Sequence, residues 1–214
     1  MGQPRREHRR RQVRHRERRL RRARRVKPPA LRRAAFLDRD GVVNRDIGYL
    51  HRWEDFEFLP GVLDAMRRLH QAGYALVIVT NQSGIARGYY TEADYQALTA
   101  KLREALDAAG CPAAGIYHCP HHPSGKVPAL AVECDCRKPQ PGMLLQAARE
   151  LGISLPDSFI VGDKLADARA GRAAGVGRVY LVHSGHALER GAEAAADGVF
   201  DGLAACADAV LSAG

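Results

Sequence analysis

Short apolar runs that alternate with helix-like segments constrain the fold of this 214-residue chain more than any other feature. Residues 34–37 and 75–79 are two such runs, and polar side chains, Asp38 and Thr80, follow them directly. Apolar runs of this length are typical of strands buried on both faces of a parallel sheet. Because helix-like segments separate them, the pattern predicts right-handed βαβ crossovers and a Rossmann-like, doubly wound α/β sheet.

Capping residues and helix breakers delimit the other elements, with Thr91 as a predicted N-cap. The predicted helices span residues 61–72, 92–109, 142–151 and 165–174, and the predicted strands span residues 34–37, 75–79, 116–118, 159–161 and 178–182. Ligands of such sheets bind beyond the carboxyl ends of the strands. We therefore expect Asp38, Thr80 and Asp163 at one functional edge.

The net charge of +9 comes from one end of the chain. Residues 1–27 hold 14 of the 33 basic and two of the 24 acidic residues, which leaves 19 basic and 22 acidic side chains elsewhere. A run of arginine repels itself, so residues 1–29 are predicted to be a disordered arm and residues 30–214 a folded domain. The arm is interpreted as a nucleic-acid or acidic-surface tether, a solvated tail, or an overextended reading frame.

Composition argues against membrane and secreted classes. No apolar run approaches the roughly 20 residues that span a bilayer, and no apolar segment follows the N-terminal arginines as in a secretory signal. Five cysteines, an odd number, argue against a disulfide framework. We expect a cytoplasmic protein, and a monomer because the sequence shows no obvious second interface.

Four polar motifs fall at the predicted functional edge. Asp38 and Asp40, two residues apart after a strand, can face one crevice, where one carboxylate takes up a phosphoryl group and the other handles the proton. Residues 80–84 offer hydroxyls and amides for phosphate oxygens, and Arg137-Lys138 offers cations. Asp163 can hold Mg²⁺ with the first pair, because Mg²⁺ prefers a few carboxylates plus substrate phosphate. Together the motifs predict a Mg²⁺-dependent phosphatase.

A second cluster is typical of a structural metal site. Cys119-x-His121 and Cys134-x-Cys136, separated by 12 residues, offer three thiolates and one imidazole. Four protein ligands leave no open position for catalysis, as in closed zinc sites. On spacing alone, His122 is an equal candidate for the imidazole.

The segment after the Asp38 motif is too short for a large cap domain, since about 20 residues separate Asp40 from the next predicted helix. Trp53, Phe56 and Phe58 in this segment form either a flap over the site or a small apolar cluster under the loop. The site is expected to be open and suited to a small or terminal phosphate ester.

The order of these motifs resembles that of the haloacid dehalogenase-like (HAD) phosphohydrolases, from about residue 34 to residue 183. Within that superfamily, five segments are similar to the heptose-1,7-bisphosphate 7-phosphatase family: Asp46-x-Gly48-Tyr49, TNQSGIARG (80–88), CPHHP (119–123), CDCRKP (134–139) and GDK (162–164). The resemblance implies a HAD-like core, removal of the C7 phosphate of D-glycero-D-manno-heptose 1,7-bisphosphate, and a place in nucleotide-activated heptose synthesis for lipopolysaccharide or another glycan. The arginine arm has no counterpart in the family.

The resemblance also implies roles for the matching positions. Asp38 would form an aspartyl-phosphate, and Asp40 would act as general acid and then base. Asp38, the Asp40 main-chain carbonyl and Asp163 would bind Mg²⁺. Thr80 and Lys138 would stabilise the transferring phosphoryl group.

The implied substrate and zinc sites complete this set. The implied substrate-binding residues are Asp46, Gly48, Tyr49, Asn81, Gln82, Ser83, Arg137 and Lys164. Arg137 would meet the second phosphate. His121, rather than His122, would complete a zinc-clipped loop over residues 119–136. Asp167 would either orient the inner groups or only place charge at a helix N-terminus.

Other functions fit part of the pattern. Histidinol-phosphate phosphatases resemble this chain in the aspartate motif and the zinc loop, and a phosphatase of broader sugar-phosphate specificity would use the same chemistry. Arg137 favours a substrate with a second anionic group. A nucleic-acid-associated protein that uses residues 1–27 is opposed by the acidic body and its complete catalytic set.

Overall fold

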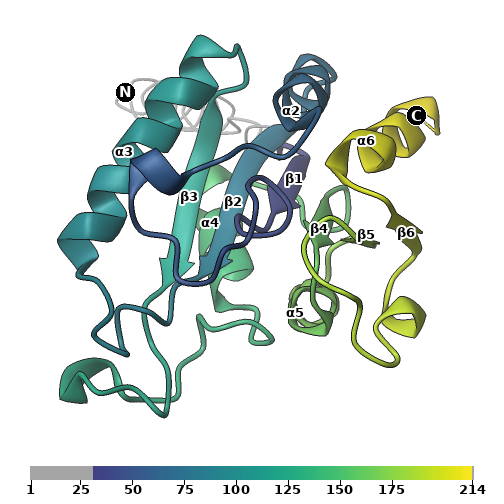
Figure 1. Ribbon diagram of the computed structural model, residues 1–214. Coiled ribbons are helices and arrows are strands. Elements are labelled where there is room, and N and C mark those ends of the chain that lie inside the picture. The colour runs from purple at the N-terminus through teal and green to yellow at the C-terminus, as the bar shows by residue number, and fades with distance from the viewer. Residues whose placement is uncertain (1–30, 214) are drawn as a thin grey trace, which may run out of the picture. The chain divides into compact units, whose positions relative to one another are not determined.

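The computed structural model describes residues 31–213, so the prediction of a disordered arm over residues 1–29 lies outside the described residues. Six strands form one parallel sheet in the order β3-β2-β1-β4-β5-β6 (Figure 1). The strands are β1 (Ala34–Leu37), β2 (Ala75–Asn81), β3 (Ala113–Cys119), β4 (Phe159–Gly162), β5 (Arg178–Val182) and β6 (Gly198–Phe200). The predicted doubly wound α/β sheet is confirmed.

Helices cover both faces of the sheet. They are α2 (Val62–Gln71), α3 (Glu92–Ala108), α4 (Gly142–Leu151), α5 (Leu165–Ala174) and α6 (Leu203–Ser212), with short 3₁₀ turns η1 (Trp53–Asp55), η2 (Pro128–Leu130) and η3 (Glu193–Ala195). Successive side chains of a strand point to opposite faces. Ala35 and Leu37 of β1 therefore join the core formed with α2, α3 and α6, whereas Ala34 and Phe36 pack on the side of α4 and α5.

The predicted helices and strands are all present, with small shifts at their ends. Thr91 caps α3 in a reciprocal capping box with Asp94, as the acidic first turn suggested. β3 is longer than the predicted 116–118. β6 and α6, at the end of the chain, were not predicted.

The segment between β1 and α2 contains no cap domain, and none is formed elsewhere in residues 31–213. Trp53 stacks on Phe56, with ring centroids 4.9 Å apart, and Phe58 meets Phe56 edge to face. All three pack against the core beside α2. The apolar-cluster interpretation is therefore confirmed and the flap interpretation is wrong.

Among the helices that the structure describes, none is long and apolar enough to cross a membrane.

Candidate active site

The polar edge lies where the strand order reverses. Leu37 of β1 pairs with Ile78 of β2 on one side and with Val161 of β4 on the other. The residues that follow these strands therefore meet at one edge, where ligands of doubly wound sheets bind. A cavity of about 310 Å³ opens there. It is lined by Asp38, Asp40, Asp46, Gly48, Tyr49, Thr80, Asn81, Gln82, Ser83, Tyr90, Lys138, Lys164, Ala166 and Asp167.

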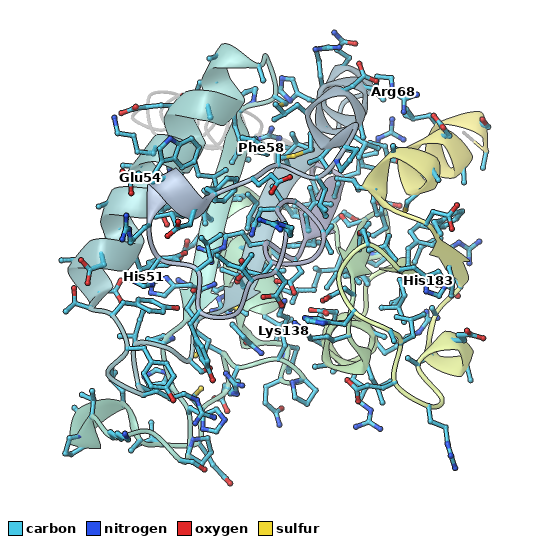
Figure 2. The ribbon with its side chains drawn as sticks, viewed as in Figure 1. His51, Glu54, Phe58, Arg68, Lys138 and His183 are labelled. Carbon is cyan, nitrogen blue, oxygen red and sulfur yellow. The ribbon has the colours of Figure 1, made fainter. Side chains whose placement is uncertain are left out.

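Lys138, labelled in Figure 2, is a buried cation. Its Nζ lies 2.8 Å from Asp38 Oδ1 and 2.6 Å from Asp167 Oδ1, and it donates to the Val79 carbonyl oxygen at 2.7 Å. Burial alone would lower the pKa of Lys138, but the two carboxylates outweigh it and raise that pKa. The lysine is thus a fixed positive charge next to the predicted nucleophile.

Asp167 contacts both the start of α5 and the buried lysine, so it does more than place charge at a helix N-terminus. Its Oδ2 accepts the Lys164 main-chain N–H at 3.1 Å at the start of α5, and its Oδ1 pairs with Lys138. A carboxylate at a helix N-terminus is favoured by the helix dipole. The same side chain therefore starts α5 and orients the buried lysine.

Three buried carboxylates, those of Asp38, Asp163 and Asp167, place oxygens within 4.8 Å of one another. Neither Asp163 oxygen accepts a hydrogen bond from the described residues. Burial, followed by repulsion from Asp38, raises the pKa of Asp163 to about 8. Burial also raises the pKa of Asp38 to about 6, although Lys138 opposes the shift. A hard divalent cation prefers such oxygens and relieves their repulsion, so this set fits Mg²⁺.

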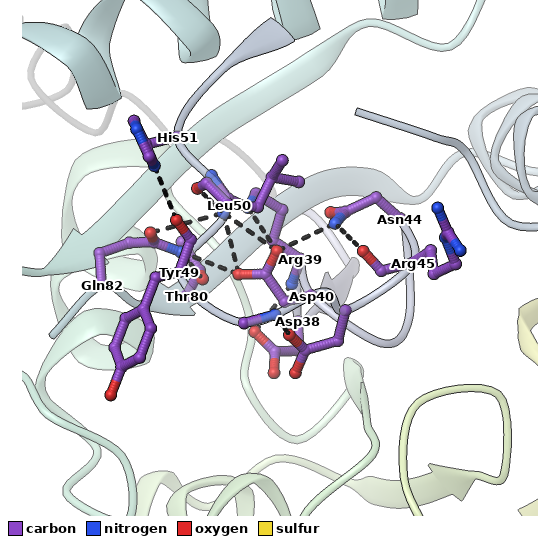
Figure 3. A network of polar contacts seen from close by, with 12 residues as sticks. Asp38, Arg39, Asp40, Asn44, Arg45, Tyr49, Leu50, His51, Thr80 and Gln82 are labelled. Carbon is purple, nitrogen blue, oxygen red and sulfur yellow. Dashed lines mark hydrogen bonds and ion pairs between the residues drawn. The ribbon is translucent and has the colours of Figure 1, made fainter. Parts of the chain in front are cut away.

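The Asp40 carboxylate is held by a buried polar network (Figure 3). Arg39 Nη2 donates to Oδ1 at 3.0 Å and to Oδ2 at 2.9 Å. Asn44 Nδ2 donates to Oδ1 at 2.9 Å, and Gln82 Nε2 donates to Oδ2 at 3.0 Å. The Asp40 side chain is 17% exposed and lines the cavity, so a second carboxylate stands fixed in the cavity wall.

The residues of the predicted phosphate-binding segment, 80–84, make two kinds of contact. Thr80 and Ser83 line the cavity, and Thr80 Oγ1 accepts a hydrogen bond from Gln82 at 2.8 Å. The Asn81 side chain makes two reciprocal hydrogen bonds, each 3.0 Å long, with the main chain of Lys138. Gln82 accepts from the Tyr90 hydroxyl at 2.6 Å. The amides of Asn81 and Gln82 therefore position other groups, although both residues line the cavity.

Asp46 is a hydrogen-bonded and ion-paired residue in the cavity wall. Its Oδ1 accepts the Gly48 N–H at 2.9 Å, and its Oδ2 lies 3.2 Å from Lys164 Nζ and 2.7 Å from His186 Nε2. Burial alone would raise the pKa of Asp46, but Gly48, His186 and Lys164 outweigh it and lower that pKa. Tyr49 follows with φ 55°, in the left-handed region that few non-glycine residues adopt. The predicted sugar-site residues therefore share one wall.

Arg137 does not line this cavity. It lines a neighbouring depression of about 440 Å³ with residues of the zinc loop, and its Nη1 donates to the His121 carbonyl oxygen at 3.3 Å. Because Arg137 directly precedes Lys138, which lines the cavity, its main chain lies close to the cavity. Its guanidinium is the one predicted substrate-binding group that stands outside the cavity.

The predicted zinc ligands converge in the loop after β3. Cys134 Sγ lies 3.5 Å from Cys119 Sγ and 3.2 Å from Cys136 Sγ, and His121 Nδ1 lies 3.4 Å from Cys136 Sγ. All four ligand atoms fall within 4.8 Å of one another. Three sulfur atoms and one imidazole nitrogen at these separations fit a closed tetrahedral zinc site.

Three polar contacts of the site were not predicted. Arg39 is the spacer of the Asp-x-Asp motif, and Asn44 follows the motif without a role of its own in the prediction. His186 lies in the loop after β5, which brings it to Asp46. Of these three residues, only Arg39 gave a signal in the sequence. It stands between Asp38 and Asp40, and a cation in that position can pair with either carboxylate.

Comparisons with known proteins point to one family. Residues 135–206 match a family model described as "HAD-hyrolase-like". The chain is 51% identical over 171 residues to D-glycero-beta-D-manno-heptose-1,7-bisphosphate 7-phosphatase of Yersinia pestis, a match that covers 80% of this chain and 91% of the relative. It is 47% identical over 154 residues to the D-glycero-alpha-D-manno-heptose-1,7-bisphosphate 7-phosphatase of Photorhabdus laumondii, covering 72% and 84%.

A solved structure shares the fold as a whole. The D,D-heptose 1,7-bisphosphate phosphatase of B. bronchiseptica, crystallised with magnesium and phosphate, superposes with a TM-score of 0.73 at 36% identity. The match covers 85% of this chain and 99% of that one. Fold, carboxylate edge and relatives together define the class as HAD-like phosphohydrolases. The identity to the bacterial relatives narrows this further. The chain belongs to the family of D-glycero-D-manno-heptose-1,7-bisphosphate 7-phosphatases.

Proposed function

We propose that this chain removes the C7 phosphate of D-glycero-D-manno-heptose 1,7-bisphosphate through an aspartyl-phosphate on Asp38. The observation that carries the proposal is one cavity lined by Asp38, Asp40 and Lys138, with Asp163 buried next to Asp38. Relatives that share about half of the aligned residues carry the name of this activity.

In the first half of the reaction, a carboxylate oxygen of Asp38 attacks phosphorus. The bond between phosphorus and the C7 oxygen breaks, and that oxygen takes a proton from Asp40. Lys138 and the Thr80 hydroxyl stabilise the charge on the transferring phosphoryl oxygens, a contribution of about 3 kcal/mol for each well-placed donor.

In the second half, a water molecule attacks the phosphorus of the aspartyl-phosphate. Asp40, now ionised, takes a proton from this water, and the bond between phosphorus and Asp38 breaks. Inorganic phosphate leaves, and both aspartates return to their starting states. The fixed position of Asp40 serves both proton transfers.

Asp38, the Asp40 main-chain carbonyl and Asp163 would hold Mg²⁺ in this site. When bound, the ion neutralises charge between the nucleophile and the phosphate, two anions that must approach each other. Neither Asp163 oxygen accepts a hydrogen bond from the described residues, which supports this assignment.

The remaining residues would select the substrate. Asp46, Tyr49 and Lys164 would contact the heptose hydroxyls, and Gly48 provides the left-handed turn, at φ 72°, between Asp46 and Tyr49. Asn81 and Gln82 would act by positioning, as their hydrogen bonds suggest. Ser83 would contact phosphate. Arg137, from the neighbouring depression, would reach toward the second phosphate.

The zinc ion, held by Cys119, His121, Cys134 and Cys136, would have a structural role. A cytoplasmic location and a monomeric state remain predictions. Nucleic-acid binding through residues 1–27 stays an alternative prediction, which the mildly acidic rest of the chain does not favour.

The deciding experiment measures phosphate release, with Mg²⁺, from both anomers of D-glycero-D-manno-heptose 1,7-bisphosphate and from histidinol phosphate. We expect a higher kcat/KM for the heptose bisphosphates than for histidinol phosphate, because only they carry a second phosphate that can meet Arg137. A preference for histidinol phosphate would keep the chemistry and overturn the substrate. Similar rates on many sugar phosphates would indicate a broad-specificity enzyme.

Loss of the His186 contact is expected to weaken substrate binding. In His186→Ala, Asp46 keeps its bonds to Gly48 and Lys164 but loses its 2.7 Å partner, so we expect KM to rise about 3- to 10-fold with kcat little changed. Steady-state kinetics with the heptose bisphosphate test this. His183→Ala, an exposed histidine of the same loop, is the control. An unchanged KM would exclude a role for His186.

A further inference from the structure

Arg39 has no part in the chemistry outlined above, yet its side chain is only 1% exposed. Burying a guanidinium is costly unless it is paired. Arg39 meets this cost through Asp40: Nε lies 3.2 Å from Oδ1, and Nη2 lies within 3.0 Å of both oxygens. Asp40 is thus the ionic partner that offsets the burial of Arg39.

The Arg39 guanidinium also contacts the loop over residues 46–50. Nη2 donates to the Leu50 carbonyl oxygen at 3.0 Å, and Leu50 is buried next to the segment that carries Asp46 and Tyr49. The Arg39 side chain therefore links the Asp40 carboxylate to the loop over residues 46–50, which carries part of the predicted sugar site (Figure 3). A lysine could not make these contacts, because it lacks the planar fork of donors.

The donors on Asp40 leave it little freedom. Arg39 and Asn44 hold Oδ1, and Arg39 and Gln82 hold Oδ2, so rotation about the carboxyl bond would break several hydrogen bonds at once. General acid catalysis depends on such placement, because a misplacement of 1 Å can cost on the order of 100-fold in rate. The network sets where Asp40 can meet a leaving-group oxygen.

We propose that Arg39 is a positioning residue, which holds the Asp40 carboxylate against the leaving-group oxygen and fixes the 46–50 loop relative to it. This inference rests on the proposed phosphatase chemistry but not on the identity of the sugar. It therefore predicts that substitution of Arg39 lowers kcat/KM most for substrates whose leaving group needs a proton.

The test compares phenyl phosphate with p-nitrophenyl phosphate in Arg39→Lys. The two esters have similar shapes, but nitrophenolate leaves without protonation, whereas the more basic phenolate benefits from a proton. The parameter is kcat/KM, which reports the steps up to departure of the leaving group. We expect a loss of about 10- to 100-fold for phenyl phosphate and of less than about threefold for p-nitrophenyl phosphate.

Two further variants separate positioning from damage to the fold. Asn44→Ala removes one neutral donor from Asp40 and should produce the same bias, with a smaller loss, even if Arg39→Lys does not fold. In an Asp40→Asn background, Arg39→Lys should add no further bias between the esters. Arg45→Lys, at an exposed ion pair with Glu57, is the matched control and should leave both rates unchanged.

Equal losses on both esters for Arg39→Lys and Asn44→Ala would show a purely structural role and overturn the proposal. Unchanged rates in both variants would overturn it as well. If the wild type hydrolyses aryl phosphates but not the heptose bisphosphate, the proposed substrate fails while the role of Arg39 is still tested.

Discussion

Replacing Asp38 by asparagine is expected to lower kcat for every phosphate ester by about 10⁴-fold or more, because an amide oxygen does not form the aspartyl-phosphate. The fold should persist, since asparagine has nearly the same shape and Lys138 keeps Asp167 and the Val79 carbonyl as partners. Phosphate release tests the loss of kcat, and the melting temperatures of the wild type and of Asp38→Asn test whether the fold persists. Acid-quenched wild type should carry a phosphate that maps to the peptide containing Asp38.

The control for this prediction is Asp107→Asn, an exposed aspartate on α3 outside the cavity, which should leave activity unchanged. A fully active Asp38→Asn would refute the aspartyl-phosphate mechanism. A label on another residue would do the same. A loss of activity together with unfolding would instead mean that Lys138 needs both of its carboxylate partners for stability.

Removing one zinc ligand is the second change for which we expect a large effect. Cys136→Ser should reduce bound zinc from about one ion per chain to almost none and lower the free energy of unfolding by about 3 kcal/mol or more, since structural zinc contributes directly to folding. We also expect turnover to fall, because Lys138 is two residues from the lost ligand. Elemental analysis, thermal unfolding and phosphate release measure the three effects.

Cys111→Ala provides the comparison, because Cys111 lies outside the predicted zinc site, in the core beside α2 and α3. It should keep its zinc and its activity, although it will lose some stability from the cavity left in the core. Purified wild type without zinc, or Cys136→Ser with full zinc and full stability, would contradict the assignment of this loop.

The centre of the sheet could be predicted because its strands are buried on both faces. Every residue of β1 is apolar and buried, and the run stands out from its polar flanks. β6 has only three residues, all partly exposed, and α6 is rich in alanine on every side, so neither shows a clear period. Edge elements bury less surface, and their sequences are correspondingly less constrained.

The residues of the site could be predicted wherever a strand end places them, as for Asp38, Thr80 and Asp163. Contacts that depend on the path of a loop could not. His186 reaches Asp46 only because the segment after β5 returns to the cavity, and no local pattern encodes that path. The orientation of Arg39 could not be predicted for a different reason, because either Asp38 or Asp40 could have been its partner.

The place of β1 in the sheet also matters while the chain is being made. β1 can pair with β2 soon after both are synthesised, but its other edge stays open until residue 159 and the rest of β4 have been added. An unpaired strand edge is a template for association with other chains. Asp163 arrives with the same strand. The pairing that completes the carboxylate set therefore also closes the edge through which a growing chain could aggregate.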